Sequence, residues 1–262
     1  LCAQDEGKTS IPLDHFYAKP IHGATALRKI LKDFHFGLYS GLGKTYFNGK
    51  DGKGHVINIP LAATLHYEFD RYRIGAGYSY ELMGMGSLSS NTTGEKINPT
   101  GHIRKYWGMA GVSFYRWNDY LFTGDLQVGS YKMKVNYNSS QVVTSTFFNF
   151  GVTAERNLSE YFKVFVRPYY EIKSCNLMPS GGQSIHYNIN GLYATVGFTY
   201  SIPELPRCFL RDCHAQINHA HGNKEYRSRR HPIYKKQNPG YGENDPVLLK
   251  YKGKNKKKLD PY

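Results

Sequence analysis

The sequence predicts an all-β fold: an eight-stranded antiparallel up-and-down transmembrane β-barrel, with a short N-terminal helical segment and a basic, extended C-terminal tail. The composition of 262 residues includes 23 Tyr and 27 Gly, the residue types that girdle a membrane barrel and pack closely between its strands. No run of eighteen apolar residues occurs, which excludes a transmembrane helix but not a spanning strand. Between residues 34 and 202, eight segments alternate apolar with polar or small residues, as half-buried strands do.

Composition divides the chain into three parts. Residues 1–33 form a mixed N-terminal segment, residues 34–202 carry the alternating pattern, and residues 203–262 form the tail. The tail holds 14 Lys or Arg against 6 Asp or Glu, so a net +8 of the chain's +14 lies there. We therefore expect a barrel over 34–202 with separate appendages at both ends.

The N-terminal segment suggests export and a short helix. Its first four residues, Leu1 to Gln4, resemble the end of a secretory signal cut before Gln4. Lipid modification of Cys2 is an alternative. Residues 24–33 repeat apolar side chains at helical spacing, which predicts an amphipathic helix packed on the barrel end or on the membrane surface.

The first four strands are predicted from strict period-2 alternation, which sends one set of side chains to lipid and the other to the lumen. The fourth segment is predicted to place Tyr115 inward. The outward residues include Phe34, Phe36, Leu38 and Leu42 in the first segment, Ile57, Ile59, Leu61 and Leu65 in the second, Tyr72, Ile74, Tyr78 and Leu82 in the third, and Tyr106, Val112 and Phe114 in the fourth.

The last four strands follow the same rule. Each segment spans ten to fourteen residues, close to the length that a tilted spanning strand needs. A soluble sandwich or a lipocalin-like barrel is the alternative. The outward residues include Tyr120, Phe122, Leu126 and Val128 in the fifth segment, Phe148, Phe150 and Val152 in the sixth, Val164, Val166 and Ile172 in the seventh, and Leu192, Val196, Phe198 and Tyr200 in the eighth.

Two prolines interrupt the pattern. Pro60 and Pro168 lie inside the second and seventh segments. Because a closed barrel has no free edge where a missing N–H donor would be harmless, we expect a bulge at each.

The connections predict the orientation. The links after the second, fourth and sixth strands are short, whereas the others are longer and rich in Gly, Ser and Asn. Small bacterial barrels have short periplasmic turns and long external loops. We therefore expect a protein of the bacterial outer membrane with both termini periplasmic, and with external loops at residues 44–55, 83–102, 135–142 and 175–187.

Residues 34–202 resemble the small outer-membrane barrels typified by OmpA and OmpX. The resemblance rests on alternation and loop asymmetry rather than on a motif, and Gln4 with the tyrosine-rich strands is similar to the version found in Bacteroidota. It implies a small barrel of the outer membrane, and some barrels of this architecture look similar to accessory subunits of envelope machines such as type IX secretion. The chain departs from the simplest members because it continues beyond the eighth strand.

The inward face of the predicted barrel carries five acids and five bases. An eight-stranded barrel has just enough interior for side chains to fill it. We therefore expect an internal network of ion pairs that closes the lumen, with an ion or proton path as the alternative. The ten residues are Glu68, Arg73, Glu81, Lys105, Asp125, Glu155, Lys163, Arg167, Glu171 and Lys173.

Catalysis is not predicted, and no cofactor is expected. The outward hydroxyls of Ser40 and Ser130 have no His and acid at a recognisable spacing, and His66 is expected inside the barrel near its periplasmic end. A lipid-modifying enzyme remains a third hypothesis, because a triad built from loop residues could escape notice.

The tail contains a cluster of sulfur and imidazole groups: Cys208, Cys213, His214, His219 and His221. These are ligands that zinc prefers, but their spacing is not a standard one. In an oxidising periplasm a Cys208–Cys213 disulfide is favoured and no metal is expected. Cys175, in a predicted external loop, has no obvious partner.

The end of the tail predicts a surface for binding a partner. Basic clusters alternate with Tyr and Pro, which suits an extended segment docking on an acidic protein surface, on peptidoglycan or on anionic lipid head groups. Nucleic acid is not expected in a periplasmic location. The residues are Arg227, Arg229, Arg230, Tyr234, Lys235, Lys236, Tyr251, Lys254, Lys256, Lys257 and Lys258.

These observations favour a structural or assembly subunit of a multi-protein envelope complex. Its partners would be the lipid bilayer and other outer-membrane or periplasmic proteins, reached through the tail. The alternative from a different class is a ligand-binding or adhesive barrel that acts through its external loops.

Overall fold

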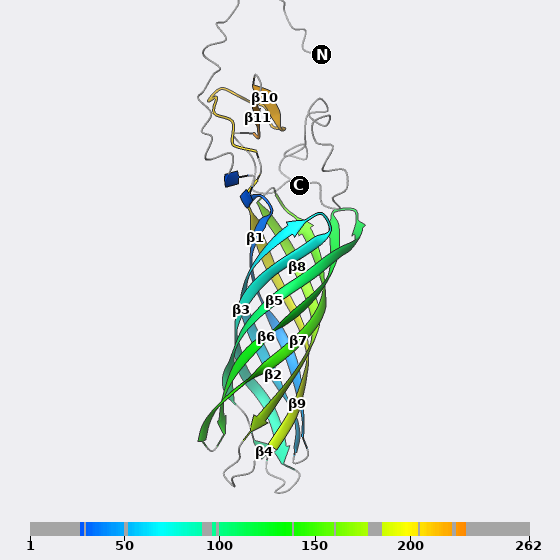
Figure 1. Ribbon diagram of the computed structural model, residues 1–262, viewed down its shortest axis with the longest axis vertical. Helices are drawn as coiled ribbons and strands as arrows, with labels where there is room; N and C mark the ends of the chain where they lie inside the picture. The colour runs from blue at the N-terminus through cyan, green and yellow to red at the C-terminus, as the bar shows by residue number, and fades with distance from the viewer. Residues whose placement is uncertain are drawn as a thin grey trace, which may run out of the picture.

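Eight long strands form a barrel in the computed structural model (Figure 1). The structure describes residues 27–28, 30–49, 52–90, 96–97, 100–137, 139–159, 161–177, 185–203, 205–221 and 224–228. The long strands are β1 (Phe34–Gly49), β2 (Gly52–Phe69), β3 (Tyr72–Ser90), β5 (Thr100–Trp117), β6 (Tyr120–Tyr137), β7 (Ser139–Asn157), β8 (Phe162–Leu177) and β9 (Ile185–Ser201).

Every long strand pairs antiparallel with its neighbour along the chain, and β1 also pairs with β9 from His35↔Ser201 to Gly49↔Tyr187. This last pairing closes the sheet, so none of the eight strands presents a free edge. The two-residue strand β4 (Lys96–Ile97) pairs only with β3. The predicted eight-stranded antiparallel barrel is therefore confirmed.

The predicted alternation is also confirmed along the strands. On β2, for example, Leu61 is 62% exposed and the next residue, Ala62, is 3% exposed. One inward assignment was wrong: Tyr115 is exposed on the outer face beside Phe114. A bulge between Ser113 and Tyr115 shifts the β5–β6 register by one residue, and such a shift moves a side chain to the other face.

The prediction of a bulge at each of the two prolines was wrong. The register is the same on both sides of Pro60 in the β1–β2 pair and on both sides of Pro168 in the β7–β8 pair. In each pair a short stretch of cross-strand pairing is missing instead, which removes the need for the absent N–H. The second bulge lies elsewhere, between Val56 and Ile57 of β2.

The turns at one end of the barrel are tight. Two-residue links join β2 to β3 and β5 to β6, and their first residues, Asp70 and Asn118, have φ angles of 51° and 49°. Asp and Asn tolerate this left-handed conformation, which matches the twist of a hairpin. The chain enters β1 and leaves β9 at this same end (Figure 1), which we call the short-turn end.

The opposite end differs from the prediction, because most of the residues expected in loops belong to strands. β1 and β2 leave only residues 50–51 between them, and β6 and β7 leave only residue 138. The strands are 16 to 19 residues long, whereas a tilted strand crosses a bilayer with about 9–11. The barrel is therefore much longer than a membrane is thick.

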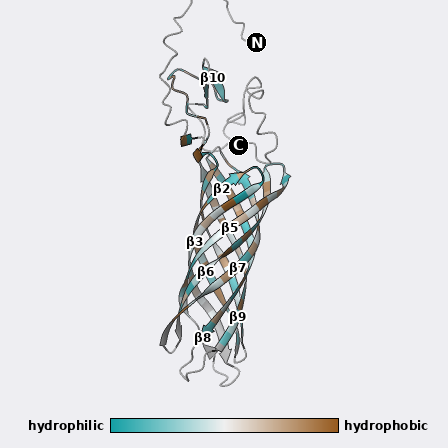
Figure 2. Cartoon of the chain, viewed as in Figure 1, coloured by the Kyte–Doolittle hydropathy of each residue, from teal (hydrophilic) through white to brown (hydrophobic). Residues whose placement is uncertain are grey.

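Exposed apolar and aromatic side chains form a belt next to the short-turn end. Figure 2 colours the same strands by the hydropathy of their residues. Beyond the belt, most outward side chains are polar, as at Lys44, Arg104, Lys132 and Asn188, and Tyr46 and Val142 are exposed apolar exceptions among the described residues. An apolar exterior of this kind is stable only in lipid. The barrel consequently has a lipid-facing half and a polar half that projects past the membrane surface at the far end.

The interior of the projecting half is packed with apolar and aromatic side chains, including the fully buried Val56, Ile103, Met133 and Ile189. Tyr193 lies across this lumen and stacks on Tyr169, with 4.7 Å between ring centroids. A Cβ on Gly43 would lie 2.0 Å from its ring, and one on Gly191 would lie 2.6 Å away. Only glycine leaves room for the ring at these positions.

The predicted N-terminal helix is described in part. Leu27, Arg28, Ile30 and Leu31 are helical, and the N–H of Lys32 donates to the carbonyl of Arg28 at 2.9 Å. Residues 1–26, with Cys2 and the expected cleavage point, lie outside the described residues. No helix in the described part of the chain has the length and apolar composition required for crossing a membrane.

The belt predicts where a charge will damage assembly. Val152→Lys, in the belt on β7, should destabilise the barrel in lipid vesicles by roughly 2–4 kcal/mol because it places an ammonium group in the bilayer. Asn188→Lys, on the outer face of β9 in the polar half, lies opposite the uncharged Asn48 and Ser174. It is the control and should fold as the wild type does. Urea unfolding in vesicles measures both, and equal stability of the two variants would contradict the position of the belt.

Candidate functional site

All ten charged residues predicted for the lumen lie inside the barrel, and each contacts an opposite charge. Nine of the ten are buried, and the Glu68 side chain is 20% exposed. They fall into three groups along the barrel axis. Each group holds equal numbers of carboxylates and cations.

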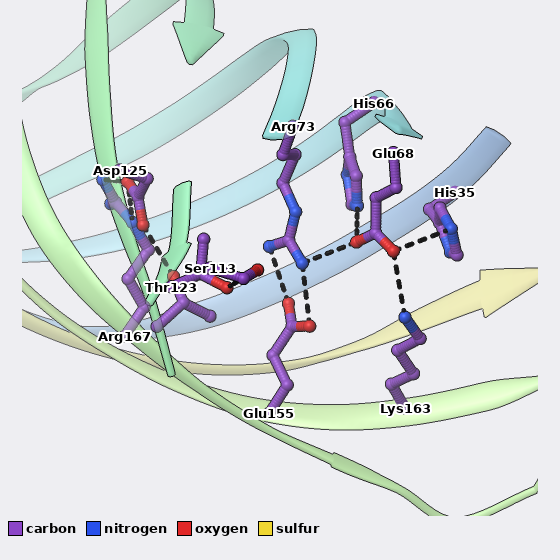
Figure 3. A network of polar contacts seen from close by, with 11 residues as sticks. His35, His66, Glu68, Arg73, Ser113, Thr123, Asp125, Glu155, Lys163 and Arg167 are labelled. Atoms are coloured by element: carbon purple, nitrogen blue, oxygen red, sulfur yellow. Dashed lines mark hydrogen bonds and ion pairs between the residues drawn. The ribbon is translucent and has the colours of Figure 1, made fainter. Parts of the chain in front are cut away.

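The first group lies nearest the short-turn end and joins β2, β3, β7 and β8 (Figure 3). The Arg73 guanidinium donates to both oxygens of Glu155, at 2.7 and 2.8 Å, and to Glu68 at 2.6 Å. The Lys163 ammonium donates to the second Glu68 oxygen at 3.1 Å. Two carboxylates and two cations therefore neutralise one another across four strands.

Two histidines flank this group. Nε2 of His35 and Nε2 of His66 lie 3.1 and 3.3 Å from the Glu68 carboxylate. The three side chains are close enough together to suggest a metal site. However, the cations Arg73 and Lys163 already share that carboxylate, and their charge opposes a further cation. We therefore assign the histidines to the ion-pair network.

The second group centres on Asp125 and Arg167. Nε of Arg167 donates to Asp125 at 2.8 Å, and its terminal nitrogen donates both to Asp125 and to the Asn149 oxygen, the latter at 2.8 Å. Thr153 donates to the other Asp125 oxygen at 2.7 Å, and Asn149 donates to Gln127 at 3.0 Å. Strands β6, β7 and β8 are joined through this group.

The third group joins β3, β5 and β8 in the middle of the barrel. The Lys105 ammonium contacts Glu81 and donates to both oxygens of Glu171, at 2.6 and 2.7 Å. Lys173 donates to Glu171 at 2.8 Å. The Lys105 ammonium also lies 5.2 Å from the ring centroids of Phe147 and Tyr193, which favours the charged form further.

Neutrality within each group matters because charges in a narrow lumen lose their hydration. A buried carboxylate is stable only when it is paired and hydrogen-bonded. A cavity of about 30 Å³ lies between the first two groups, which is room for roughly two waters. The cavity borders buried nitrogens of His66, Arg73 and Arg167 that have no protein partner. These nitrogens could donate to bound water, so we assign the cavity to water rather than to a path for ions.

The outward hydroxyl considered for catalysis on β1 is already engaged. Ser40 donates to the carbonyl of Pro60 at 2.9 Å. His66 faces the lumen near the short-turn end, as predicted, and is separated from this hydroxyl by the barrel wall. In the described part of the chain, these residues do not form a nucleophile–base pair.

The tail folds where an extended segment was expected. Residues 205–228, here called the tail unit, contain the hairpin of β10 (His219–His221) and β11 (Lys224–Tyr226). The N–H of Cys208 donates to the Arg227 carbonyl and the N–H of Arg227 donates to Pro206, both at 3.0 Å. The described tail is therefore a small paired structure at the short-turn end (Figure 1).

Contacts in the described part of the chain link the tail unit to the rest of the protein. The Arg227 guanidinium lies 4.8 Å from the ring centroid of Tyr161, in the turn between β7 and β8. Arg28 of the helical segment donates to the Leu205 carbonyl at 3.3 Å. Arg227 is buried, so its assignment to partner binding was wrong. The other ten predicted tail residues, from Arg229 to Lys258, lie outside the described residues.

The expected disulfide in the tail is absent: Cys208 and Cys213 are both free thiols. Each faces a histidine instead, Cys208 facing His221 and Cys213 facing His219. Burial and the neighbouring His219 lower the pKa of His221, and burial raises the pKa of the Tyr226 hydroxyl. Cys175 is also a free thiol, buried in β8 rather than placed in a loop.

A basic face lies on the outside of the projecting half. Arg104 of β5 is directly opposite Lys132 of β6, and Lys134 follows on the same face. Every acidic residue that the structure describes within the eight long strands faces the lumen. The outward bases therefore have no strand carboxylate beside them. The sequence contained this signal. Along β5 and β6, the three residues occupy the same alternate positions as the outward-facing side chains of the belt.

No protein-family model and no curated protein matches the chain. Among solved structures, the barrel is similar to Neisserial surface protein A at 9% identity, with a TM-score of 0.44 over 63% of this chain and 96% of that chain. It is similar to the outer membrane protein OprG of Pseudomonas aeruginosa at 12% identity, with a TM-score of 0.46 over 66% and 97%.

The attachment invasion locus protein Ail of Yersinia pestis, solved with the heparin analogue sucrose octasulfate, has 16% identity and a TM-score of 0.34 over 64% and 99%. TM-scores this low support no inference about function. The barrel assignment rests on the closed strand pairing itself.

The third charge group predicts a large loss of folding free energy when one of its charged side chains is replaced. Lys105→Met should destabilise the barrel by about 3–5 kcal/mol because it leaves Glu81 buried beside no other described cation. Adding Glu81→Gln to Lys105→Met should restore a large part of the loss. The control Arg156→Gln breaks an exposed pair with Asp119 and should cost about 1 kcal/mol or less. Urea unfolding in vesicles compares the three, and equal effects of Lys105→Met and Arg156→Gln would contradict the network.

Proposed function

We propose that this protein is a non-enzymatic barrel of the bacterial outer membrane that acts as a structural or assembly subunit of an envelope complex. Its tail would bind the partner. The observation that carries the proposal is the docking of the tail unit on the short-turn end through Arg227 and Tyr161. A barrel that only anchors itself in lipid needs no such appendage.

The filled lumen supports this proposal by leaving no described interior surface for transport. Function is then expected at the two ends. We propose that the short-turn end is periplasmic, because the belt begins there and the long polar half projects from the opposite side, as external loops do in small barrels. Membership of an envelope machine such as type IX secretion remains a prediction that rests on the resemblance alone.

The chain beyond the tail unit supplies the charge for the proposed contact. Residues 229–262 hold 10 Lys or Arg against 3 Asp or Glu, a net +7 of the chain's +14. Its partner would be an outer-membrane or periplasmic protein with an acidic surface, with peptidoglycan and anionic lipid head groups as alternatives. Because exposed charges interact weakly in salt, the Tyr and Pro residues between them would provide contact area.

Deletion tests the proposal directly. Removing residues 203–262 should leave a folded barrel, seen as a heat-sensitive shift on unheated gels, but should abolish recovery of the stoichiometric partners that purify with the full chain from native membranes. Changing Lys254, Lys256, Lys257 and Lys258 to Gln should weaken recovery more at low salt than at high salt. Unchanged recovery with the truncated barrel would overturn the proposal.

A second candidate function is supported by the basic face on the projecting half. Opposed like charges such as Arg104 and Lys132 destabilise a strand pair, whereas a bound polyanion would neutralise both. This favours adhesion to an anionic saccharide through the external end of the barrel.

Heparin provides the probe for this second function. The double variant Arg104→Glu and Lys132→Glu should lose binding of heparin by the vesicle-reconstituted barrel, and wild-type binding should fall steeply as salt rises. Arg156→Glu, an exposed position near the short-turn end, is the matched control. Equal heparin binding by the double variant and the control would contradict the adhesive function.

A further inference from the structure

Four metal-ligating side chains converge in the tail unit. One ligand atom from each of Cys208, Cys213, His219 and His221 lies within 4.8 Å of all the others. Sγ of Cys208 is 3.4 Å from Nε2 of His221, and Sγ of Cys213 is 3.2 Å from Nε2 of His219. Tetrahedral zinc, with bonds of about 2.3 Å to sulfur and 2.0–2.1 Å to nitrogen, places neighbouring ligand atoms roughly 3.3–3.8 Å apart. The two sulfur–nitrogen separations, 3.4 and 3.2 Å, are close to these values.

The local backbone aims the four groups at one point. His219 and His221 are two residues apart in β10, so both project from the same face of the strand. Cys208 is held by its N–H bond to Arg227, the residue that follows β11. Cys213 follows a turn, with its N–H directed at the Leu210 carbonyl at 3.5 Å. Three separate pieces of chain therefore contribute ligands.

A supporting hydrogen bond prepares one imidazole for metal binding. Nδ1 of His219 lies 2.9 Å from the Ile217 carbonyl. Because a carbonyl only accepts, Nδ1 carries the proton and the lone pair of Nε2 points towards the sulfurs. Ligating histidines in metal sites are oriented by this kind of contact.

The tail unit also lacks the apolar core that would hold it together without a metal. Of the apolar residues that the structure describes between 205 and 228, only Cys208 and Tyr226 are buried. Units this small usually need a disulfide, a metal or a partner subunit. No disulfide joins the described cysteines, and the ligand cluster connects Cys208, Cys213 and β10.

We propose that Cys208, Cys213, His219 and His221 bind one zinc ion, which holds the tail unit in its docked form. Two thiolates and two neutral imidazoles suit tetrahedral zinc. Binding releases the two thiol protons, so the site carries no net charge. Four protein ligands complete the coordination, which makes the site structural rather than catalytic. The proposal does not depend on the tail having a partner.

Zinc would also protect the two cysteines from oxidation. Without metal, thiols this close can form a disulfide in an oxidising compartment. With metal, both sulfurs are coordinated. The metal content and the oxidation state of Cys208 and Cys213 are therefore alternative outcomes that one protein preparation can distinguish.

Metal analysis of the full chain tests the site. Protein extracted from native membranes in detergent without chelators should contain about one zinc ion per chain. The double variant Cys208→Ser and Cys213→Ser should contain almost none while its barrel stays folded on unheated gels. His214→Ala, an exposed histidine of the same unit outside the cluster, and Cys175→Ser, a thiol in the barrel, are matched controls and should keep the zinc.

A second measurement identifies the ligands. After removal of the metal and reduction, Co²⁺ alone should produce the intense visible absorption of tetrahedral cobalt with thiolate ligands, and added Zn²⁺ should abolish it. His219→Ala with His221→Ala should lose this spectrum, whereas His214→Ala should keep it. Zinc content no higher than in the double cysteine variant, a Cys208–Cys213 disulfide in the untreated protein, or no cobalt spectrum with the reduced chain would each overturn the proposal.

Discussion

The architecture depends on one constraint: charges inside a closed eight-stranded barrel must neutralise one another. The interior has room for side chains and a few waters, so a carboxylate there cannot rely on bulk solvent. Arg73 meets two carboxylates, Lys105 meets two more, and Arg167 meets Asp125. Because these contacts run between strands far apart in the sequence, the network ties opposite sides of the barrel wall together. It also fills the space that transport would require, which leaves the two ends for function.

The sequence predicted the barrel well wherever lipid lies on one side of a strand and the packed lumen on the other. That difference produces the alternation seen at Leu61 and Ala62. Beyond the membrane the outward side chains become mostly polar and the inward ones apolar, as at Val56 and Ile189. The alternation of the spanning half is therefore not continued there. This is why strand residues such as Lys44 and Arg104 lay in or next to predicted loops. Tyr115 was predicted on the wrong face for a different reason. A bulge shifts the alternation of inward and outward side chains by one residue, and nothing in the composition indicates it.

The tail was the hardest part to predict because its structure comes from contacts over long distances. Arg227 reaches Tyr161 in a barrel turn, and nothing in the sequence around either residue indicates that pairing. The cysteines and histidines were identified as a group, but their spacing did not distinguish a disulfide from a metal site. Only the fold brings His219 and His221 into contact with the two sulfurs, and this geometry favours the metal.

If the tail binds a partner as proposed, these features explain how a narrow, filled barrel organises that partner. The chain after Ser228 starts from a unit held beside the short turns by Arg227 and by the Arg28 contact with Leu205. Tethering at a fixed point raises the effective concentration of the following segment near that membrane face without any added affinity. Basic clusters that would bind weakly as a free peptide could then bind a partner in the same membrane. In the proposed function the barrel supplies position, the tail unit supplies the fixed point, and the segment beyond it supplies the charge.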